Sequence, residues 1–260
     1  MTPPVIEMET ILRDDQLCLR RLPGRQKRLV VIFGGAKLPR NGALRSEFLH
    51  TVSHNGTNPI LNVQDMKCTW YSAPGLVTRI TAAIKAEADR VGAKEIITLG
   101  NSMGGFGAIL FTREMPVARA LALSPQVSMH SDLITETRFD EYQPDFGPEQ
   151  AVRSVNDIIP LTKTEVTVIF GRGSKYDNAQ AALLNPAPNL RLSHDARSGH
   201  DTAKWLKKQN LLVPLVRSVI YGHPRKLDGV LAKIKQQDAP GRQKTTGAIP
   251  AHEGANHDAV

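Results

Sequence analysis

Residues 96–105 decide the fold, and they read Ile96-Ile97-Thr98-Leu99-Gly100-Asn101-Ser102-Met103-Gly104-Gly105. The β-branched start predicts a strand, and the continuation from Phe106 to Arg113 predicts a helix. Between them lies Gly-x-Ser-x-Gly, in which the two glycines leave room for a sharp turn. Ser102 would then stand at a helix N-terminus, whose free N–H groups favour a developing negative charge. The pattern predicts a nucleophilic Ser102; the alternative is a glycine-rich loop that only packs the helix close to the sheet.

The rest of the chain alternates apolar runs with longer helical patterns, which is typical of a parallel sheet with crossover helices. The expected strands are a pair within Glu9–Arg20, then Leu29–Phe33, Ile60–Val63, Ile96–Leu99, Ala118–Leu123, Val166–Phe170 and Leu190–Ser193. The expected helices are Asn41–Ser53, Gly75–Arg90, Phe106–Arg113 and Asp201–Ile220. The predicted fold class is therefore α/β, a three-layer domain with a mainly parallel sheet flanked by helices.

A nucleophilic serine needs a base, and the base needs a carboxylate that orients it. Asp177 and His200 each follow an expected strand, on the carboxyl side of the sheet where Ser102 also lies. The chain order serine, acid, histidine suits a strand-turn-helix serine. His194 is a rival base within a strand pattern, and His200 could be only a loop histidine. Asp177 could be only a helix cap, which would leave Asp157 or Asp201 as the acid.

Together these motifs resemble the α/β-hydrolase superfamily over about residues 29–221. The resemblance rests on the Gly-Asn-Ser-Met-Gly-Gly turn, on Phe33-Gly34-Gly35 after an early strand, on Asp177, and on Ser198-Gly199-His200-Asp201 before the last helix. It implies a triad of Ser102 as nucleophile, His200 as general base and Asp177 as acid. It also implies an oxyanion hole made by the backbone N–H of Met103 and that of Ala36 or Gly35. Many members carry a histidine where this chain has Gly34.

The same interpretation divides the chain into a hydrolase-like domain over residues 1–221 and a flexible C-terminal tail over residues 222–260. Residues 126–160 lack a clear sheet period and read as a lid-like insertion. Within the tail, residues 226–235 could form a short helix, whereas Pro, Gly, Gln, Thr and His dominate from Ala239 onward.

The 260 residues carry a net charge of +8, and nine Lys or Arg lie between Arg13 and Arg45 against two acids. Aromatic residues make up only 5% of the chain, so stacking platforms for nucleic acid are poorly supplied. Two cysteines, Cys18 and Cys68, exclude a disulfide framework and a multi-cysteine zinc site. We expect a cytoplasmic protein that uses no metal or cofactor, because no targeting, membrane or metal-ligand pattern occurs.

These observations predict a serine hydrolase of carboxylic esters that acts through a Ser102 acyl-enzyme. The alternatives are an acyltransferase that uses the same triad on a sugar or another alcohol, and a non-catalytic binding or scaffold protein on a hydrolase fold. The expected partner is a small-molecule or glycan ester. Lys37 and Arg40, with Arg45, follow the expected oxyanion loop and favour an anionic substrate, unless they are only a solvated basic surface.

Overall fold

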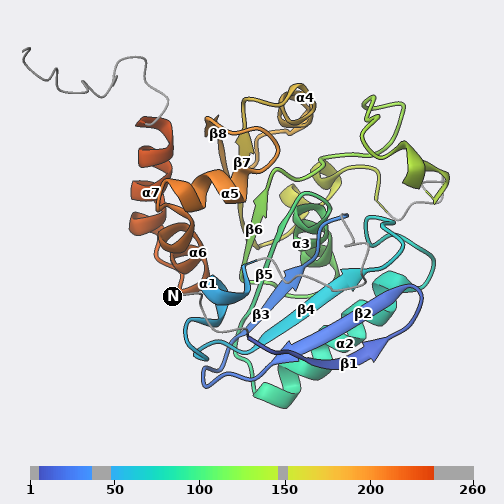
Figure 1. Cartoon of the computed structure of the whole chain (residues 1–260), viewed down its shortest axis with the longest axis vertical. Helices are drawn as coiled ribbons and strands as arrows, with labels where there is room; N and C mark the ends of the chain where they lie inside the picture. The colour runs from blue at the N-terminus through green and yellow to red at the C-terminus, as the bar shows by residue number, and fades with distance from the viewer. Residues whose placement is uncertain (1–5, 37–47, 146–151, 237–260) are drawn as a thin grey trace, which may run out of the picture.

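In the part of the chain that the structure describes, eight strands form one sheet in the order β1-β2-β4-β3-β5-β6-β7-β8 (Figure 1). The computed structural model describes residues 6–36, 48–145 and 152–236. β1 pairs antiparallel with β2, and β2 with β4, while all other neighbours are parallel. The strands are β1 (Glu9–Arg13), β2 (Leu17–Leu22), β3 (Leu29–Phe33), β4 (Ile60–Asp65), β5 (Ile96–Asn101), β6 (Arg119–Leu123), β7 (Glu165–Gly171) and β8 (Leu190–Ala196). The predicted α/β class with a mainly parallel sheet is confirmed.

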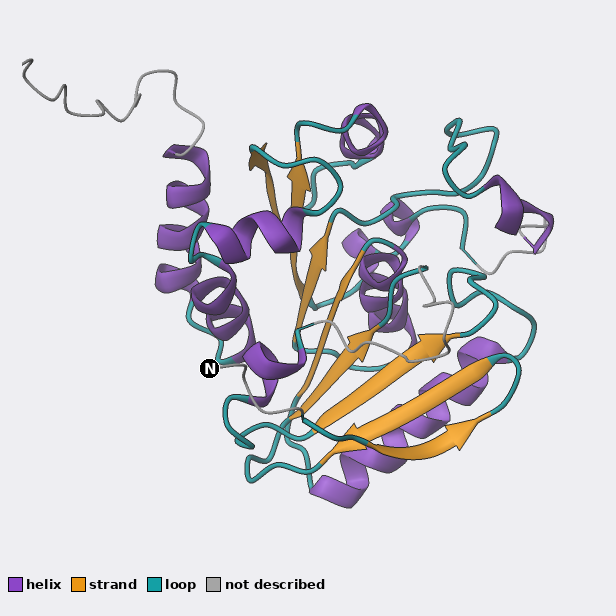
Figure 2. Cartoon of the chain, in the orientation of Figure 1, coloured by secondary structure: helices purple, strands orange, loops and turns teal. Residues whose placement is uncertain are grey.

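Helices cover both faces of the sheet, as Figure 2 shows. One face carries α2 (Leu76–Val91), α3 (Met103–Glu114) and α4 (Lys175–Leu183), and the other carries α1 (Leu49–Ser53), α5 (Thr202–Lys208), α6 (Leu212–Ile220) and α7 (Pro224–Gln236). Successive side chains of a strand point to opposite faces. Leu29, Val31 and Phe33 of β3 therefore enter the core beneath α2 and α3, while Val30 and Ile32 enter the other core. This explains why the β3 sequence is apolar at every position.

The parallel strands bring their carboxyl ends to one edge of the sheet. Phe33 at the end of β3 pairs with Gly100 of β5, and Leu123 at the end of β6 pairs with Ile169 of β7. β7 and β8 finish together, with Gly171 paired with Ala196. The loops that follow these strands consequently meet at this edge, and they carry the residues singled out from the sequence.

The prediction of one continuous closing helix over residues 201–220 is wrong, because two helices, α5 and α6, occupy this stretch. The break falls at Asn210, which has φ 58° in the left-handed region. Asparagine tolerates this conformation better than most residues. The amide of Leu211 then donates to the carbonyl of Leu206 at 2.8 Å and ends α5 before α6 begins. Of the helix expected over Asn41–Ser53, the structure describes the last part, which is α1. Residues 37–47 lie outside the described ranges.

The described part of the expected insertion at residues 126–160 contains short 3-10 helices. They are η1 (Asp140–Asp145), η2 (Val155–Asp157) and η3 (Ile159–Leu161). Val127, Phe139 and Val155 are buried in the same core as α2 and α3. This segment therefore packs on the domain through its apolar side chains, and its action as a lid stays a prediction.

Within the tail expected from residue 222, the short helix considered over residues 226–235 is present as α7, which packs on the domain rather than extending as a flexible segment. Leu227, Val230 and Ile234 recur at helical spacing and are buried against the core that α6 covers. A helix that buries such a stripe is held by tertiary packing. Residues 237–260 lie outside the described ranges.

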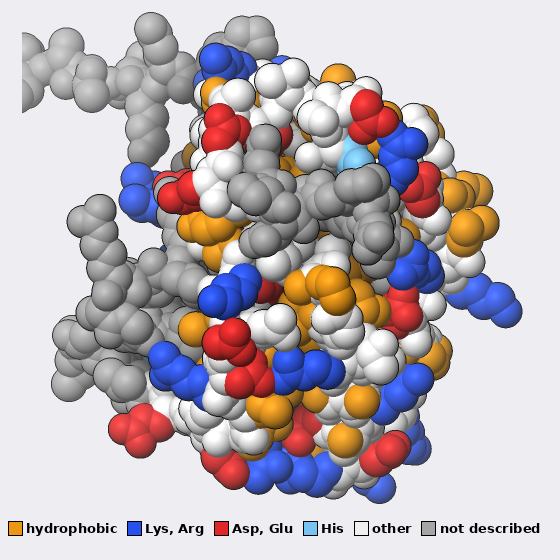
Figure 3. All heavy atoms as spheres, turned by 90° about the vertical axis from the view of Figure 1, so that its right-hand side faces the viewer, with side chains coloured by type: hydrophobic (Ala, Val, Ile, Leu, Met, Phe, Trp, Pro, Cys, Tyr) orange, Lys and Arg blue, Asp and Glu red, His pale blue; other side chains and the backbone are white. Residues whose placement is uncertain are grey.

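On the face that Figure 3 shows, Lys and Arg side chains are interspersed with Asp and Glu side chains. In the three described ranges, no helix is both long and apolar enough to cross a membrane. Cys18 and Cys68 are both buried free thiols, and burial raises the pKa of Cys68 to about 12. Both therefore behave as small buried hydrophobic residues.

Candidate active site

Ser102 occupies a sharp turn between β5 and α3. Its backbone has φ 56° and ψ −126°, a strained combination for a residue with a side chain. A Cβ atom on Gly100 would collide with the carbonyl group of Gly104, and one on Gly104 would collide with that of Phe33. The two glycines are thus required by the close approach of α3 to β3 and β5. The turn holds Ser102 at the N-cap of α3.

The structure brings Ser102, His200 and Asp177 into one hydrogen-bonded chain. Nε2 of His200 lies 2.8 Å from Oγ of Ser102, and Nδ1 of His200 lies 2.8 Å and 3.1 Å from the two carboxylate oxygens of Asp177. The Asp177 side chain is 2% exposed, and that of His200 is 26% exposed. The carboxylate is therefore shielded from water while the imidazole reaches the surface. This arrangement allows a proton to pass from Ser102 to His200.

The loop that carries His200 is held on the ends of β6 and β7. The hydroxyl of Thr202 lies 2.8 Å from that of Ser124 and 3.0 Å from that of Ser198. The amide of Gly173 donates to the carbonyl of Ser198 at 2.7 Å. These bonds join loops from three neighbouring strands, so the position of His200 follows from the sheet itself.

Asp177 lies in the first turn of α4, whose N-cap is Ser174 rather than Asp177 itself. Its carboxylate accepts a second charged bond, from Nη1 of Arg138 at 3.0 Å. Burial opposes ionisation of Asp177, but the hydrogen bond and charge of His200, with the charge of Arg138, outweigh it. The pKa of the Asp177 carboxyl is consequently held below its ordinary value.

The rival residues lie elsewhere. Nε2 of His194 lies 2.8 Å from Oδ1 of Asn178, and its ring lies against Phe170. Asp157 and Asp201 are both exposed. Asp201 is the N-cap of α5, although its side chain makes no capping bond. The carboxylate that bonds His200 is therefore that of Asp177.

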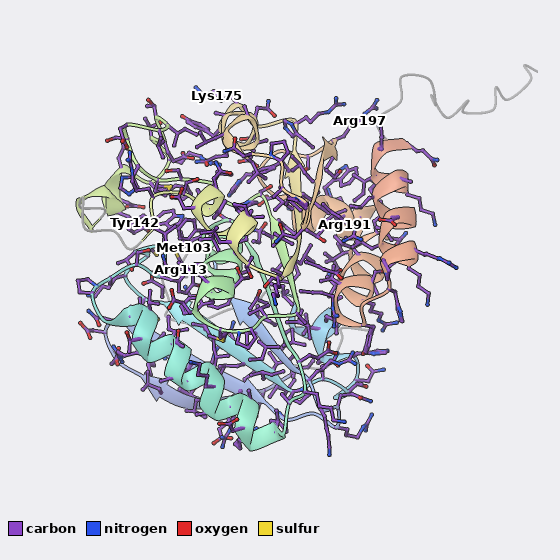
Figure 4. The ribbon with its side chains drawn as sticks, turned by 180° about the vertical axis from the view of Figure 1, so that it is seen from behind. Met103, Arg113, Tyr142, Lys175, Arg191 and Arg197 are labelled. Atoms are coloured by element: carbon purple, nitrogen blue, oxygen red, sulfur yellow. The ribbon has the colours of Figure 1, made fainter. Side chains whose placement is uncertain are left out.

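The residues predicted for an oxyanion hole lie beside Ser102 in the chain or in space. Met103, labelled in Figure 4, is the first residue of α3, and the first amides of a helix have no carbonyl partner within it. A Cβ atom on Gly35 would lie 3.6 Å from the carbonyl oxygen of Asn101, so the loop after β3 runs next to the turn at Ser102. Ala36 is buried in the same loop. The roles of the three amides stay a prediction.

Sequence reasoning missed three residues that contact the hydrogen-bonded chain directly or through one neighbour: Gln126, Trp70 and Arg138. Nε2 of Gln126 lies 3.3 Å from Oγ of Ser102, and Oε1 of Gln126 accepts from Nε1 of Trp70 at 2.9 Å. Gln126 follows the end of β6 by three residues, a place that the carboxyl-end rule could have flagged. Trp70 and Arg138 lie in irregular segments, where no sequence period points to a site.

Two predicted substrate-binding residues, Lys37 and Arg40, lie outside the described residues. Two other cationic residues, Lys175 and Arg197, are exposed and follow closely on β7 and β8, and Figure 4 labels both at the same end of the molecule. Among the described residues, no group of three or more His, Cys, Asp or Glu side chains is arranged to hold a metal ion.

Comparison with known proteins gives matches in structure. No family model and no curated protein matches the chain. The capsule O-acetyltransferase of Neisseria meningitidis serogroup A matches with a TM-score of 0.59 and 14% identity, over 82% of this chain and 97% of that one. Est1E from Butyrivibrio proteoclasticus matches with a TM-score of 0.56 and 15% identity, over 85% of this chain and 99% of that one. The Pyrococcus furiosus esterase Pf2001 matches with a TM-score of 0.52 and 15% identity, over 81% of this chain and 90% of that one.

These identities are too low to carry more than the architecture from one protein to another. The structural matches nevertheless extend over 82% and 85% of this chain and nearly all of the matched chains, so the overall architecture is shared. The resemblance seen in the sequence is thus confirmed at the level of structure, and the chain has the α/β-hydrolase fold.

Proposed function

We propose that this protein is a serine hydrolase of carboxylic esters that acts through an acyl-enzyme on Ser102. The observation that carries the proposal is the hydrogen-bonded chain from Ser102 through His200 to Asp177. Nδ1–H of His200 donates to the ionised Asp177, which leaves Nε2 free to accept the Ser102 proton. The alternative, in which His200 is only a solvated loop residue, does not account for its hydrogen bonds to both a buried carboxylate and the strained serine.

In the first half-reaction, Oγ of Ser102 forms a bond to the ester carbonyl carbon while its proton passes to Nε2 of His200. The carbonyl π pair moves to the carbonyl oxygen, where the amides of Met103 and of Gly35 or Ala36 would stabilise the charge. The intermediate collapses when the alcohol oxygen leaves with its electron pair and takes the proton from His200. In the second half-reaction, a water oxygen attacks the carbonyl carbon of the acyl-enzyme while a water proton passes to Nε2 of His200. Oγ of Ser102 then leaves with its electron pair and takes that proton from His200.

The buried Asp177 stabilises the imidazolium that forms on His200 in each half-reaction. Its lowered pKa keeps the carboxylate ionised under mildly acidic conditions. Arg138 contributes to this, and it comes from the segment 126–160 rather than from the sheet. The proposed acid is therefore bonded both to the segment 126–160, through Arg138, and to the loop after β8, through His200.

A second candidate is acyl transfer, in which an alcohol replaces water in the second half-reaction. The match to a capsule O-acetyltransferase favours it. The two activities share the acyl-enzyme and differ only in the acceptor. Addition of a sugar or simple alcohol to the ester assay separates them, because a transferase forms a new ester and a hydrolase forms mainly free acid.

Labelling with a fluorophosphonate tests the shared step, because this probe phosphonylates an activated serine. We expect the wild-type protein to label at Ser102, and Ser102→Ala and His200→Ala to label at least about 10³-fold more slowly. Asp201→Asn is the matched control, since its carboxylate is exposed and is not the one that bonds His200. A folded wild-type protein that does not label would instead support a scaffold function.

A further inference from the structure

Gln126 joins the proposed nucleophile to a tryptophan that is buried beside it. The Gln126 side chain is fully buried, at 0% exposure, just after the end of β6. Its Oε1 lies 2.9 Å from Nε1 of Trp70, and its Nε2 lies 3.3 Å from Oγ of Ser102. A buried amide needs a partner for each end, and here one end is used on the reacting oxygen itself.

The chemistry of these partners determines which way the amide points. The indole N–H of Trp70 can only donate, so the atom that it contacts must be the amide oxygen of Gln126. The NH2 group of Gln126 therefore faces Ser102 and donates to Oγ. Since Oγ already accepts this bond, the single hydroxyl proton of Ser102 is directed to Nε2 of His200, 2.8 Å away. Gln126 thus sets the direction of the hydrogen bond that catalysis requires.

We propose that Gln126 is a catalytic residue, a side-chain donor to Oγ of Ser102. The inference rests on the proposed function. When Ser102 attacks an ester, its proton passes to His200 and negative charge builds on Oγ before the new bond to carbon is complete. The Gln126 N–H stabilises that charge without losing its own proton. In deacylation the bond between carbon and Oγ breaks, Oγ takes the electron pair and then the proton of His200, and the same N–H stabilises the leaving oxygen.

Trp70 acts as a positioning residue for Gln126. The carboxylate of Asp65 accepts from the backbone amides of Lys67 at 3.0 Å, Thr69 at 2.6 Å and Tyr71 at 2.9 Å. These bonds fold the loop after β4 tightly and hold Trp70, whose ring also packs edge-to-face on Phe139 with centroids 5.1 Å apart. A fixed indole keeps the Gln126 amide from rotating its oxygen toward Ser102, which would repel the developing charge.

The test compares Gln126→Met with the wild type in single-turnover acylation by p-nitrophenyl acetate, followed by steady-state deacylation. Methionine has the length of glutamine and lacks the donor. We expect both rate constants to fall about a hundredfold to a thousandfold, as when one transition-state donor is lost, with little change in KM. Asn58→Leu is the control, since it also removes a buried amide but one that bonds the carbonyl of Val52 and the hydroxyl of Tyr221. It should lower Tm and leave both rate constants of the folded protein unchanged.

Trp70→Phe completes a double-mutant cycle. It should lower kcat by less than Gln126→Met does, and it should cause no further loss when Gln126 is already methionine. Wild-type rates for folded Gln126→Met, or additive losses in the double variant, would overturn the inference while acylation of Ser102 would still support the proposed function. A wild-type protein that is not acylated would overturn the proposed function and this inference with it.

Discussion

Arg138 donates to the same carboxylate oxygen of Asp177 that accepts from His200, at 3.0 Å and 2.8 Å. The same guanidinium also bonds both carboxylate oxygens of Glu136, at 2.8 Å and 2.6 Å. The Glu136 side chain is 1% exposed and that of Arg138 is 18% exposed, so these charges compensate each other out of water. The segment 126–160 is therefore tied electrostatically to the proposed acid, and this tie can be tested.

Arg138→Met should lower both stability and activity. It leaves Glu136 buried without its cation, and removal of one partner of a buried pair costs about 3–5 kcal/mol. It also removes one influence that lowers the pKa of Asp177, so protonation of this carboxyl, with the loss of stability that accompanies it, should begin at higher pH. Urea unfolding at a series of pH values and ester hydrolysis near neutral pH check these effects.

Arg153→Met is the control for Arg138→Met, because the Arg153–Asp132 pair is 54% and 59% exposed and such pairs contribute about 0–1 kcal/mol. Addition of Glu136→Gln to Arg138→Met should recover part of the lost stability, since the uncompensated charge is then gone. If Arg138→Met and the wild type lost stability over the same range of low pH, Arg138 would not be lowering the pKa of Asp177.

Substitution of the proposed base and acid should give graded losses. His200→Ala should lower kcat/KM by about as much as loss of Ser102, because the hydroxyl proton then has no acceptor. Asp177→Asn should cost less, since a neutral side chain still orients the ring but no longer stabilises imidazolium. Steady-state hydrolysis of a chromogenic ester measures both. If Asp177→Asn kept wild-type activity while Asp157→Asn or Asp201→Asn lost it, Asp177 would not be the acid.

The lowered pKa of Asp177 also predicts how stability depends on pH. A carboxyl whose pKa is lower in the folded state stabilises the fold above its unfolded pKa, which is about 3.9. That contribution is lost as the pH falls through the lower, folded pKa. The difference in unfolding free energy between the wild type and Asp177→Asn should therefore be largest near neutral pH and shrink below about pH 4. Denaturant unfolding at a series of pH values would contradict this by giving a constant difference.

Truncation should separate α7 from the residues beyond it. Removal of all residues after Gly222 exposes the partners of Leu227, Val230 and Ile234, each worth about 1.5–3 kcal/mol when buried. At about 2–4 °C per kcal/mol, Tm should fall by about 10 °C or more. Removal of the residues after Asp238 keeps α7, and we expect Tm to stay within about 2 °C of the full chain.

Ile234→Ala and Lys233→Ala refine the truncation experiment with single side chains. Ile234 is fully buried, so its truncation should cost about 2–5 kcal/mol, whereas Lys233 is exposed and its loss should be close to neutral. Equal Tm values for the two variants would mean that α7 is not docked in solution.

Substrate charge is the remaining expectation from the sequence. If Lys37 and Arg40 border the site, reversal of both charges should raise KM for an anionic ester far more than for a matched neutral one. Added salt should weaken the preference of the wild type, because exposed charges are screened beyond about 8–10 Å at physiological ionic strength. Lys233→Glu with Lys235→Glu is the control for net charge. Equal effects on the two esters would leave the basic run as solvated surface.

The sequence by itself determined the sheet and the place of Ser102. The mainly apolar runs of β3, β5 and β7 are local signals, since a strand buried on both faces is apolar at nearly every position, with Thr98 and Thr167 as buried polar exceptions. The Gly100 and Gly104 pattern is also local, because the collision that it avoids lies within five residues and against the neighbouring strand. His200 and Asp177 could be selected because parallel strands bring their carboxyl ends to one edge.

Only the tertiary structure decided which of several candidates meet. The sequence favoured Asp177 as the acid and left Asp157 and Asp201 as alternatives, and of the three only Asp177 lies within hydrogen-bond distance of His200. Gln126, Trp70 and Arg138 contact the site from irregular segments, where side-chain direction depends on packing rather than on a period. The apolar spacing of Leu227, Val230 and Ile234 is a local pattern that allows a helix, but the core against which α7 packs comes from residues far away in the chain.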